Sequence, residues 1–355
     1  MILWDYDKLR YKFEIGIVFN KNMMDLKSKN IQEGFLNRVK SALPNNISLV
    51  DELADLLDVS NDSAYRRLRC ETPLNIDEIA KICSHFKVPF ETDIQLDSET
   101  VTFNFFKLYG KNENFNKWLD ALLSNVKRVA NVKESNIFYA ADDVPVWHHF
   151  INEEFACFKI FYWLKCILNQ PEFADKNFDS ELIDKSLITN AKQLLNEYNK
   201  TTSTEIWTED TLNSTLKQIE YFWESGFFKN REEALRMCDH IDNVVLTLKH
   251  KAENSSKLIG KEESGVENFK FYRSEVMIGS NSILVTLGNN KVAFVSNNTF
   301  NFMTTSNIDY VNESEEWLKN LARKSILISG VSEKQRNQFF KLLRDKIEHL
   351  RNRIN

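Results

Sequence analysis

Glycine and proline are scarce in this chain, which contains 9 and 5 of them among 355 residues. Because turn-rich β architectures need both residues often, their scarcity favours long helices. The cysteines are also few: there are five, none at CxxC spacing, and the number is odd. This pattern is typical of a reducing compartment and gives no indication of a disulfide framework.

Long apolar runs are missing as well. The first 22 residues carry charged side chains from Asp5 to Glu14, which leaves no apolar core for a signal peptide. The longest apolar stretch, residues 155–168, is too short to span a bilayer and contains Lys159 and Lys165. We therefore expect a cytoplasmic protein with no membrane partner.

Signatures of catalysis are absent from the sequence, which has no P-loop, GxGxxG, serine elbow or HExxH motif. His149 and Glu153 share a helix face and could ligate a metal, but no zinc-site spacing accompanies them. Asp142 and Asp143 could act as an acid–base pair, although carboxylates in a loop before proline usually stabilise turns. Cys70 could be a redox switch, or simply a tolerated loop cysteine. We expect no enzyme activity, no cofactor and no metal.

The bulk properties describe an ordinary globular protein of more than one domain. The chain is 43% hydrophobic and 27% charged, and 355 residues suit two or three domains. Its net charge is −5 and its pI is near 5.8. These values exclude a protein that coats nucleic acid along its whole surface, so any contact with DNA must be local.

Residues 48–72, SLVDELADLLDVSNDSAYRRLRCET, predict two helices joined by a short turn. Ser48 and Ser60 are good N-caps, and each precedes an apolar pattern of helical spacing. Val59 is an apolar plug in the turn. In the second helix Ala64 and Leu68 point inward, which leaves the polar side chains on the outer face. The inward positions of the first helix are Leu49, Leu53, Leu56 and Leu57.

The outer face of the second helix carries side chains suited to DNA. Asparagine and arginine can read adenine and guanine edges in the major groove, whereas a helix N-terminus and a flanking arginine suit phosphate. A helix pair with a merely solvated arginine face is the alternative. The candidate DNA-binding residues are Asn61, Asp62, Ser63, Arg66, Arg67 and Arg69.

This segment resembles the lambda-repressor/Cro-like helix-turn-helix family, also called the XRE family, over about residues 31–90. The match includes a preceding helix at 31–43 and a following helix that starts near residue 76. The resemblance implies double-stranded DNA as a partner and a role in transcription regulation. It places base-reading positions at Asn61, Asp62, Ser63 and Arg66, and a phosphate-facing position at Arg69. It also implies that the fourth helix faces inward at Ile76, Ile79, Ile82, Cys83 and Phe86.

Two positions depart from the family pattern, which usually has glycine in the turn and after the recognition helix. Here these positions are Asp58 and Cys70. Aspartate tolerates the left-handed backbone conformation better than most residues, so Asp58 is acceptable there. Cys70 fits less well, which puts the path of the chain after the second helix in doubt.

The charge of this region is balanced. Residues 26–90 contain nine basic and nine acidic side chains. A neutral domain lacks the electrostatic attraction that supplies much of the affinity for DNA. Such a domain should bind weakly alone and depend on dimerisation, or else serve protein contacts.

The rest of the chain predicts two further domains in a mainly α protein. Residues 1–25 are either an N-terminal extension or lie ahead of a natural start at Met23 or Met24. The DNA-binding domain spans 26–92. A helical domain spans 101–262, nearly all helix from 114 to 257 after a short strand or arm. A small α+β domain spans 263–355, with an antiparallel sheet, a hairpin at Gly288–Asn290 and two closing helices.

The last helix has apolar residues at steps of 3, 4, 3 and 4, as in a coiled coil. These residues could join two copies in a homodimer or pack on the chain's own sheet. We expect a transcriptional regulator whose C-terminal region dimerises and senses an unidentified small ligand or protein partner. The alternative is a protein-interaction adaptor, for example in a toxin–antitoxin or phage-defence assembly. The seam consists of Phe340, Leu343, Ile347, Leu350 and Ile354.

Overall fold

The computed structural model describes residues 31–40, 43, 48–86, 88, 90, 100–109, 113–258 and 266–354. The chain divides into two compact units, Met1–Thr102 and Phe103–Asn355. Each unit has a hydrophobic core of its own. The predicted extension at residues 1–25 lies outside the described residues.

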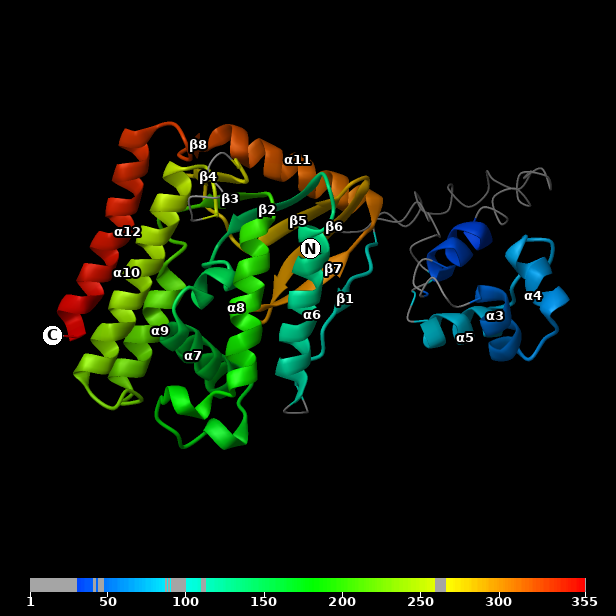
Figure 1. Cartoon of the computed structure of the whole chain (residues 1–355), viewed down its shortest axis with the longest axis horizontal. Helices are drawn as coiled ribbons and strands as arrows, with labels where there is room; N and C mark the ends of the chain where they lie inside the picture. Colours follow the sequence, from blue (N-terminus) through cyan, green and yellow to red (C-terminus); the bar gives the residue numbers. More distant parts are fainter. Residues whose placement is uncertain are drawn as a thin grey trace, which may run out of the picture. The chain divides into compact units, whose positions relative to one another are not determined.

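The N-terminal unit is a small bundle of helices around one core (Figure 1). A helix over 31–40 is followed by α3 (Leu49–Leu57), α4 (Asn61–Leu68) and α5 (Ile76–Phe86). Their apolar faces meet because each repeats at helical spacing. The buried residues of this core are Phe35, Leu36, Val39, Leu49, Leu53, Ala54, Leu57, Ala64 and Ile82.

One inward-facing prediction in this unit is wrong. Ile76 is 84% exposed, whereas Ile82 is fully buried and Ile79, Cys83 and Phe86 pack partly against the core. Ile76 is the first residue of α5, and the acidic side chains of the first turn, Asp77 and Glu78, follow it. At this first position of the helix, the apolar side chain of Ile76 faces solvent and does not contact the core.

The C-terminal unit is built on an eight-stranded mixed sheet in the order β1-β7-β6-β5-β2-β3-β4-β8. Strands β2, β3 and β4 are parallel to one another, and the other pairings are antiparallel. The strands are β1 Asn104–Phe105, β2 Ser135–Ala141, β3 Ser203–Trp207, β4 Phe269–Arg273, β5 Ser282–Leu287, β6 Asn290–Asn297, β7 Asn301–Thr305 and β8 Ile326–Leu327.

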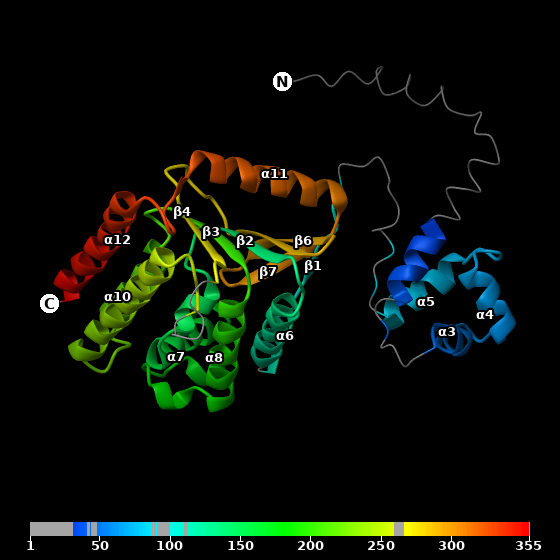
Figure 2. The same cartoon turned by 45° about the horizontal axis from the view of Figure 1, so that its top comes forward.

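Helices cover the two faces of this sheet unequally (Figure 2). Most of them, with the larger core, lie on one face, whereas α11 (Ile308–Lys324) is the one described helix on the other. The helices of the crowded face are α6 Glu113–Ala130, α7 Glu153–Tyr162, α8 Lys185–Lys200, α9 Asn213–Glu224, α10 Arg231–Glu253 and α12 Glu333–Ile354. Shorter turns are η2 Val146–Phe150, η3 Trp163–Ile167 (a π-helix), η4 Pro171–Phe173 and η5 Ser180–Leu182.

The architecture confirms the predicted fold class in part, because helices predominate but the sheet is larger and mixed. It does not follow the predicted domain division. The C-terminal unit is mixed α/β, and strands from both predicted domains form one sheet. Strand β2 pairs with β5, and β3 pairs with β4, across the predicted boundary between 262 and 263. The segment 114–257 is therefore not all helix. Backbone pairing between distant segments joins the two predicted domains into one sheet. Local sequence patterns do not indicate such pairing.

Several local predictions are confirmed. The hairpin between β5 and β6 turns at Gly288–Asn289, and Gly288 has a φ of 57° that only glycine adopts without cost. Asn230 caps α10 by accepting a hydrogen bond from the Glu233 N–H at 2.9 Å. The two closing helices are α11 and α12.

The aromatic segment after Trp147 is buried, as its all-round apolar pattern predicts. It is broken, however, into the 3-10 turn η2, the helix α7 and the π-helix η3. Seven consecutive residues of α7, Phe155 to Phe161, are buried in the protein core. Among the residues that the structure describes, no helix has the length and apolarity to cross a membrane.

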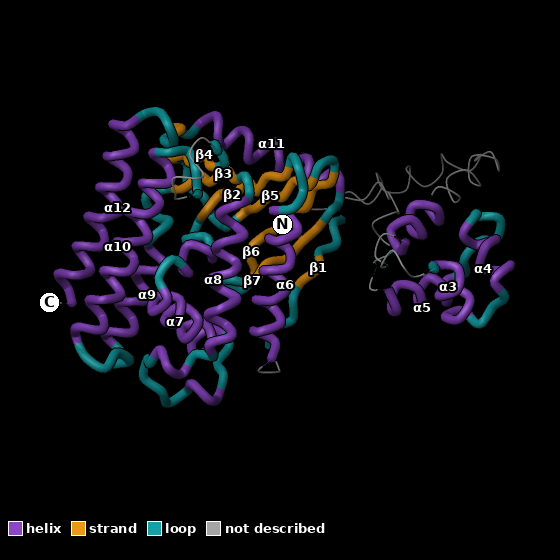
Figure 3. The backbone as a smooth tube through the Cα atoms, in the orientation of Figure 1, coloured by secondary structure: helices purple, strands orange, loops and turns teal. Residues whose placement is uncertain are grey.

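The predicted seam of α12 lies inside this unit. All five seam residues are buried, and α12 packs side by side with α10 (Figure 3). Of the two alternatives, the structure therefore shows the one in which the seam packs within its own chain. Phe340 stacks on Phe271 of β4, with ring centroids 5.8 Å apart, and α10 presents a complementary apolar face at Cys238, Ile241, Val245 and Leu248.

Candidate nucleic-acid interface

The turn between α3 and α4 has the geometry that the sequence predicts. Asp58 adopts the left-handed conformation, with φ 55°, and ends α3. The Val59 N–H donates to the Ala54 carbonyl at 3.0 Å, and Val59 packs partly against the core. The Ser60 hydroxyl oxygen then accepts from the Ser63 N–H at 3.3 Å and caps α4. These hydrogen bonds hold the short connection between the two helices in one conformation.

Helix α4 presents one polar face to solvent. Asn61, Asp62 and Arg66 are exposed and Ser63 is half-buried, while Ala64 is fully buried in the core. The face also carries Tyr65, which is 51% exposed. Sequence reasoning missed this residue, although its spacing of four from Asn61 places it on the same side of the helix. An aromatic ring there can contact the methyl group of thymine.

Arg67 is not part of this face, which corrects its predicted role. Its guanidinium Nη2 lies 2.7 Å from Glu78 Oε1 on α5, and both side chains are largely buried. It also donates to the Ser63 carbonyl at 3.1 Å. The hydrogen bond from Arg67 lowers the pKa of Glu78. Arg67 therefore joins α4 to α5.

Gln32 fixes the other end of α4. Its side-chain NH₂ donates to the carbonyls of Arg67 at 2.8 Å and Thr72 at 3.0 Å, and its carbonyl accepts from the Leu74 N–H at 2.9 Å. The Arg67 carbonyl also accepts from the Cys70 N–H at 3.0 Å, and Thr72 and Leu74 lie in the connection after α4, so Gln32 joins the first helix to the end of α4 and to that connection. A contact across about forty residues of sequence gives no local signal.

Cys70 follows α4 with a φ of 56°, the left-handed conformation that the family's glycine would adopt easily. The Glu71 N–H and the Thr72 N–H both donate to the Arg66 carbonyl, at 2.8 and 3.3 Å. The backbone therefore makes the turn that a glycine would make, at the cost of strain on the Cys70 side chain.

The charged residues of the face are paired locally. Arg66 Nε lies 3.1 Å from Asp62, Arg69 Nε lies 3.5 Å from Glu71, and the Asn61 amide donates to Asp51 at 3.1 Å. The side chains of both ion pairs are at least half exposed, so each pair contributes little to the free energy of unfolding. Either arginine can therefore leave its carboxylate to bind a phosphate or a base. The acidic partners nevertheless reduce the local positive potential.

A second polar cluster lies buried in the C-terminal unit around Glu205 of β3. The carboxylate accepts from Tyr198 O–H, from Trp207 Nε1 at 2.8 Å and from His148 Nε2 at 2.8 Å. Burial would raise the pKa of Glu205, but His148 and these hydrogen bonds outweigh it and lower the value to about 2. Lys257 donates to Ser203 Oγ at 2.6 Å and stands over the Tyr198 ring. These contacts hold β3 against η2, which carries His148, and α8, which carries Tyr198.

The other residues considered for chemistry lie in structural contacts, although His149 Nδ1 has no hydrogen-bond partner among the described residues. The N–H groups of Asp142 and Asp143 donate to Asn281 Oδ1 at 2.9 and 3.1 Å, which joins the end of β2 to the start of β5. His149 is buried beside Phe155 and Trp163. In the part of the chain that the structure describes, no three His, Cys, Asp or Glu side chains are grouped to hold a metal ion.

Comparison of the chain with protein-family models, with curated proteins and with solved structures found no match.

Proposed function

We propose that the chain is a sequence-specific DNA-binding regulator of transcription whose α4 reads the major groove. The observation that carries this proposal is the exposed polar face of α4, with Asn61, Tyr65 and Arg66 on one side. It follows a short capped turn from α3 and is held from behind by Gln32 and Arg67. A rigid helix that projects polar side chains at this spacing matches the width and donor–acceptor pattern of the major groove.

The balanced charge of the unit shapes the mechanism. With few phosphate contacts available to one copy, two copies on adjacent half-sites about 34 Å apart would bind far more tightly than one. The proposal therefore includes a pair of chains on DNA. Their contact must lie outside the buried residues of α12.

The experiment is selection of duplex DNA from a random pool by the full chain, followed by fluorescence anisotropy on the selected sequence at several salt concentrations. We expect one enriched motif and a steep loss of affinity for Arg66→Ala. Arg128→Ala, which removes an exposed arginine from the C-terminal unit, is the matched control and should bind like the wild type. The absence of any enriched motif would reject the proposal.

A second candidate function is an adaptor in which the helix-turn-helix unit binds protein. It is favoured by the pairing of both exposed arginines with carboxylates, Arg66 with Asp62 and Arg69 with Glu71. An adaptor would show no enriched DNA motif, and its affinity for random DNA would be weak at 150 mM salt, about 10⁻⁴ M or poorer. The same selection experiment therefore separates the two functions.

A further inference from the structure

Helix α11, the one described helix on the second face of the sheet, leaves part of that face uncovered. The apolar side of α11 covers the sheet with Val311, Leu318 and Leu321, which pack on Ile206 and Leu284 among others. Beside this contact a groove of about 450 Å³ lies between α11 and strands β2, β3 and β4. Its lining residues are Phe138, Thr204, Lys270, Tyr272, Glu316, Lys319, Ala322 and Arg323.

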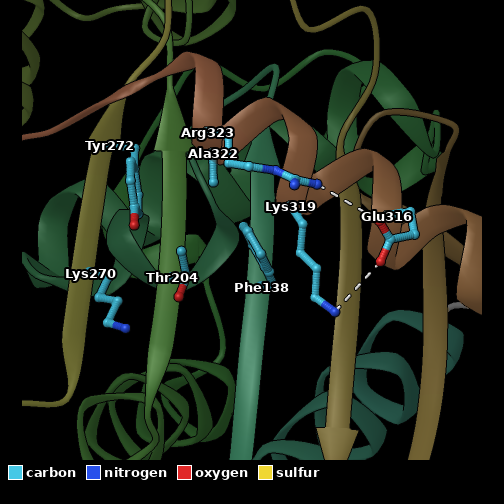
Figure 4. Close-up of a pocket in the computed structure, with 8 residues that line it drawn as sticks. All are labelled: Phe138, Thr204, Lys270, Tyr272, Glu316, Lys319, Ala322 and Arg323. Carbon is cyan, nitrogen blue, oxygen red and sulfur yellow. Dashed lines mark ion pairs between the residues drawn. The ribbon is translucent and has the colours of Figure 1, made fainter.

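The floor of the groove combines a ring with a hydroxyl and a cation. Phe138, Thr204 and Lys270 are neighbours in one row across β2, β3 and β4, since Phe138 pairs with Thr204 and Thr204 with Lys270. Side chains in such a row project from the same face, about 5 Å apart. The ring of Tyr272 lies two residues further along β4. Figure 4 shows Lys270 and Lys319 on opposite sides of Phe138 and Thr204.

The groove carries more positive than negative charge. Three cations line it, against the single lining carboxylate of Glu316, which Lys319 and Arg323 share at 3.8 Å each (Figure 4). Lys319 also pairs with Glu315, beside the lining, at 3.1 Å. The side chain of Lys270 is exposed, and no carboxylate of the described residues forms an ion pair with it. The unpaired positive charge of the groove is therefore that of Lys270.

We propose that this groove binds a mononucleotide, with its ring on Tyr272 and its phosphate over Thr204, between Lys270 and Lys319. The dianionic phosphate would take up the unpaired charge of Lys270 and compete with Glu315 and Glu316 for Lys319, and the aromatic side chain provides a flat surface for a base. The volume suits one nucleotide and leaves no room for a folded macromolecule. This inference stands independently of the proposed DNA binding.

The test is calorimetric titration of the full chain with AMP, GMP, CMP and UMP, and with adenosine and inorganic phosphate as partial ligands. We expect at least one nucleotide to bind, and its nucleoside and free phosphate to bind at least roughly tenfold more weakly. Lys270→Ala and Lys319→Ala should each weaken nucleotide binding by roughly tenfold. Lys341→Ala on α12, an exposed lysine remote in the fold, is the control and should leave the affinity unchanged.

Three results would overturn the assignment. They are the failure of all four nucleotides to bind, unchanged affinity in both lysine variants, and tighter binding of a single-stranded oligonucleotide than of the mononucleotide. Because the substituted lysines are exposed, the variants should keep the melting temperature of the wild type. That measurement separates loss of binding from loss of fold.

Discussion

At the scale of single residues, α4 divides its polar side chains between solvent and the protein itself. Asn61, Arg66 and Arg69 are exposed, whereas Arg67 is largely buried against Glu78. Three arginines within four positions therefore lie in two different environments. The residue types alone do not distinguish these environments. Successive side chains of a helix point about 100° apart, and the partner of Arg67 lies eleven residues further along the chain.

The first prediction compares these arginines. Asn61→Ala and Arg66→Ala should each lose roughly 1–3 kcal/mol of discrimination at one base pair. Arg69→Ala should weaken binding to all sequences and reduce the salt slope by about one phosphate contact. Anisotropy titrations on selected and random DNA measure both effects. Equal losses on both DNAs for Asn61→Ala would contradict its base-reading role.

The second prediction concerns backbone strain at Cys70. Replacing it with glycine should raise the free energy of unfolding of the N-terminal unit by about 1 kcal/mol, because only glycine adopts a φ of 56° without steric cost. Cys70→Ala is the control, since it removes the thiol but keeps Cβ, and it should give no such gain. Urea denaturation followed by circular dichroism provides the measurement. A gain in the alanine variant equal to that in the glycine variant would show that the thiol, not strain, is responsible.

At the scale of helices and strands, stability depends on a few contacts that cross between elements. The pair Arg67–Glu78 joins α4 to α5, and the apolar stripe of α12 joins that helix to α10 and α9. The sequence shows the stripe but not its partner. A 3-4 spacing fits another copy of the helix as well as a helix of the same chain.

The third prediction follows from the lowered pKa of Glu78. A carboxyl with a lower pKa in the folded state adds stability above its unfolded pKa, near 4.5, and loses it as the pH falls through the folded value. The melting temperature of the N-terminal unit should therefore fall between about pH 5 and pH 3. Glu78→Gln should be less stable than the wild type at pH 7 and should fall less steeply with acid. Parallel curves for the two proteins would contradict this role of the Arg67–Glu78 pair.

The fourth prediction concerns the buried seam of α12. Leu343→Ala and Ile347→Ala should each lower the free energy of unfolding of the C-terminal unit by about 2–5 kcal/mol, because both side chains are fully buried. The neighbouring Leu342, 38% exposed, is the control, and Leu342→Ala should change stability by no more than about 0.5 kcal/mol. Leu343→Asp with Leu350→Asp should unfold the unit. A folded monomer from this double variant would instead restore the coiled-coil interpretation.

At the scale of the whole molecule, residues 103–355 form one compact unit and not two. Strand β2 lies between β3 and β5, so a central strand depends on pairings from both sides of residue 262. The polar cluster at Glu205 binds side chains of η2, α8 and β3 together in the same core. Removing either half would expose strand edges and buried charge.

The fifth prediction tests this unity. A fragment of residues 101–262 should fail to fold, because β2 loses β5 and β3 loses β4. Thermal melts monitored by near-ultraviolet circular dichroism should show no cooperative transition for the fragment, and one for residues 100–355. A cooperative melt of the 101–262 fragment would support the original division into two domains.

The helix-turn-helix could be predicted from the sequence because its signals are local. Caps at Ser48 and Ser60, the left-handed position at Asp58 and the 3.6-residue period of α3 lie within about a dozen residues of one another. The exposed polar face of α4 was accordingly largely foreseen, apart from Tyr65 and Arg67. The hairpin at Gly288 and helices α10, α11 and α12 were also foreseen for the same reason.

Only the tertiary structure decided how the rest of the chain is organised. Strand β3, with sequence STEIW, is buried along its whole length although Ser203, Thr204 and Glu205 are polar. Such a segment can be buried because partners from distant residues, His148 and Lys257 among them, satisfy its polar groups. Local propensity cannot report partners more than fifty residues away. The sequence by itself therefore determined the helix-turn-helix, and long-range pairing decided the mixed sheet.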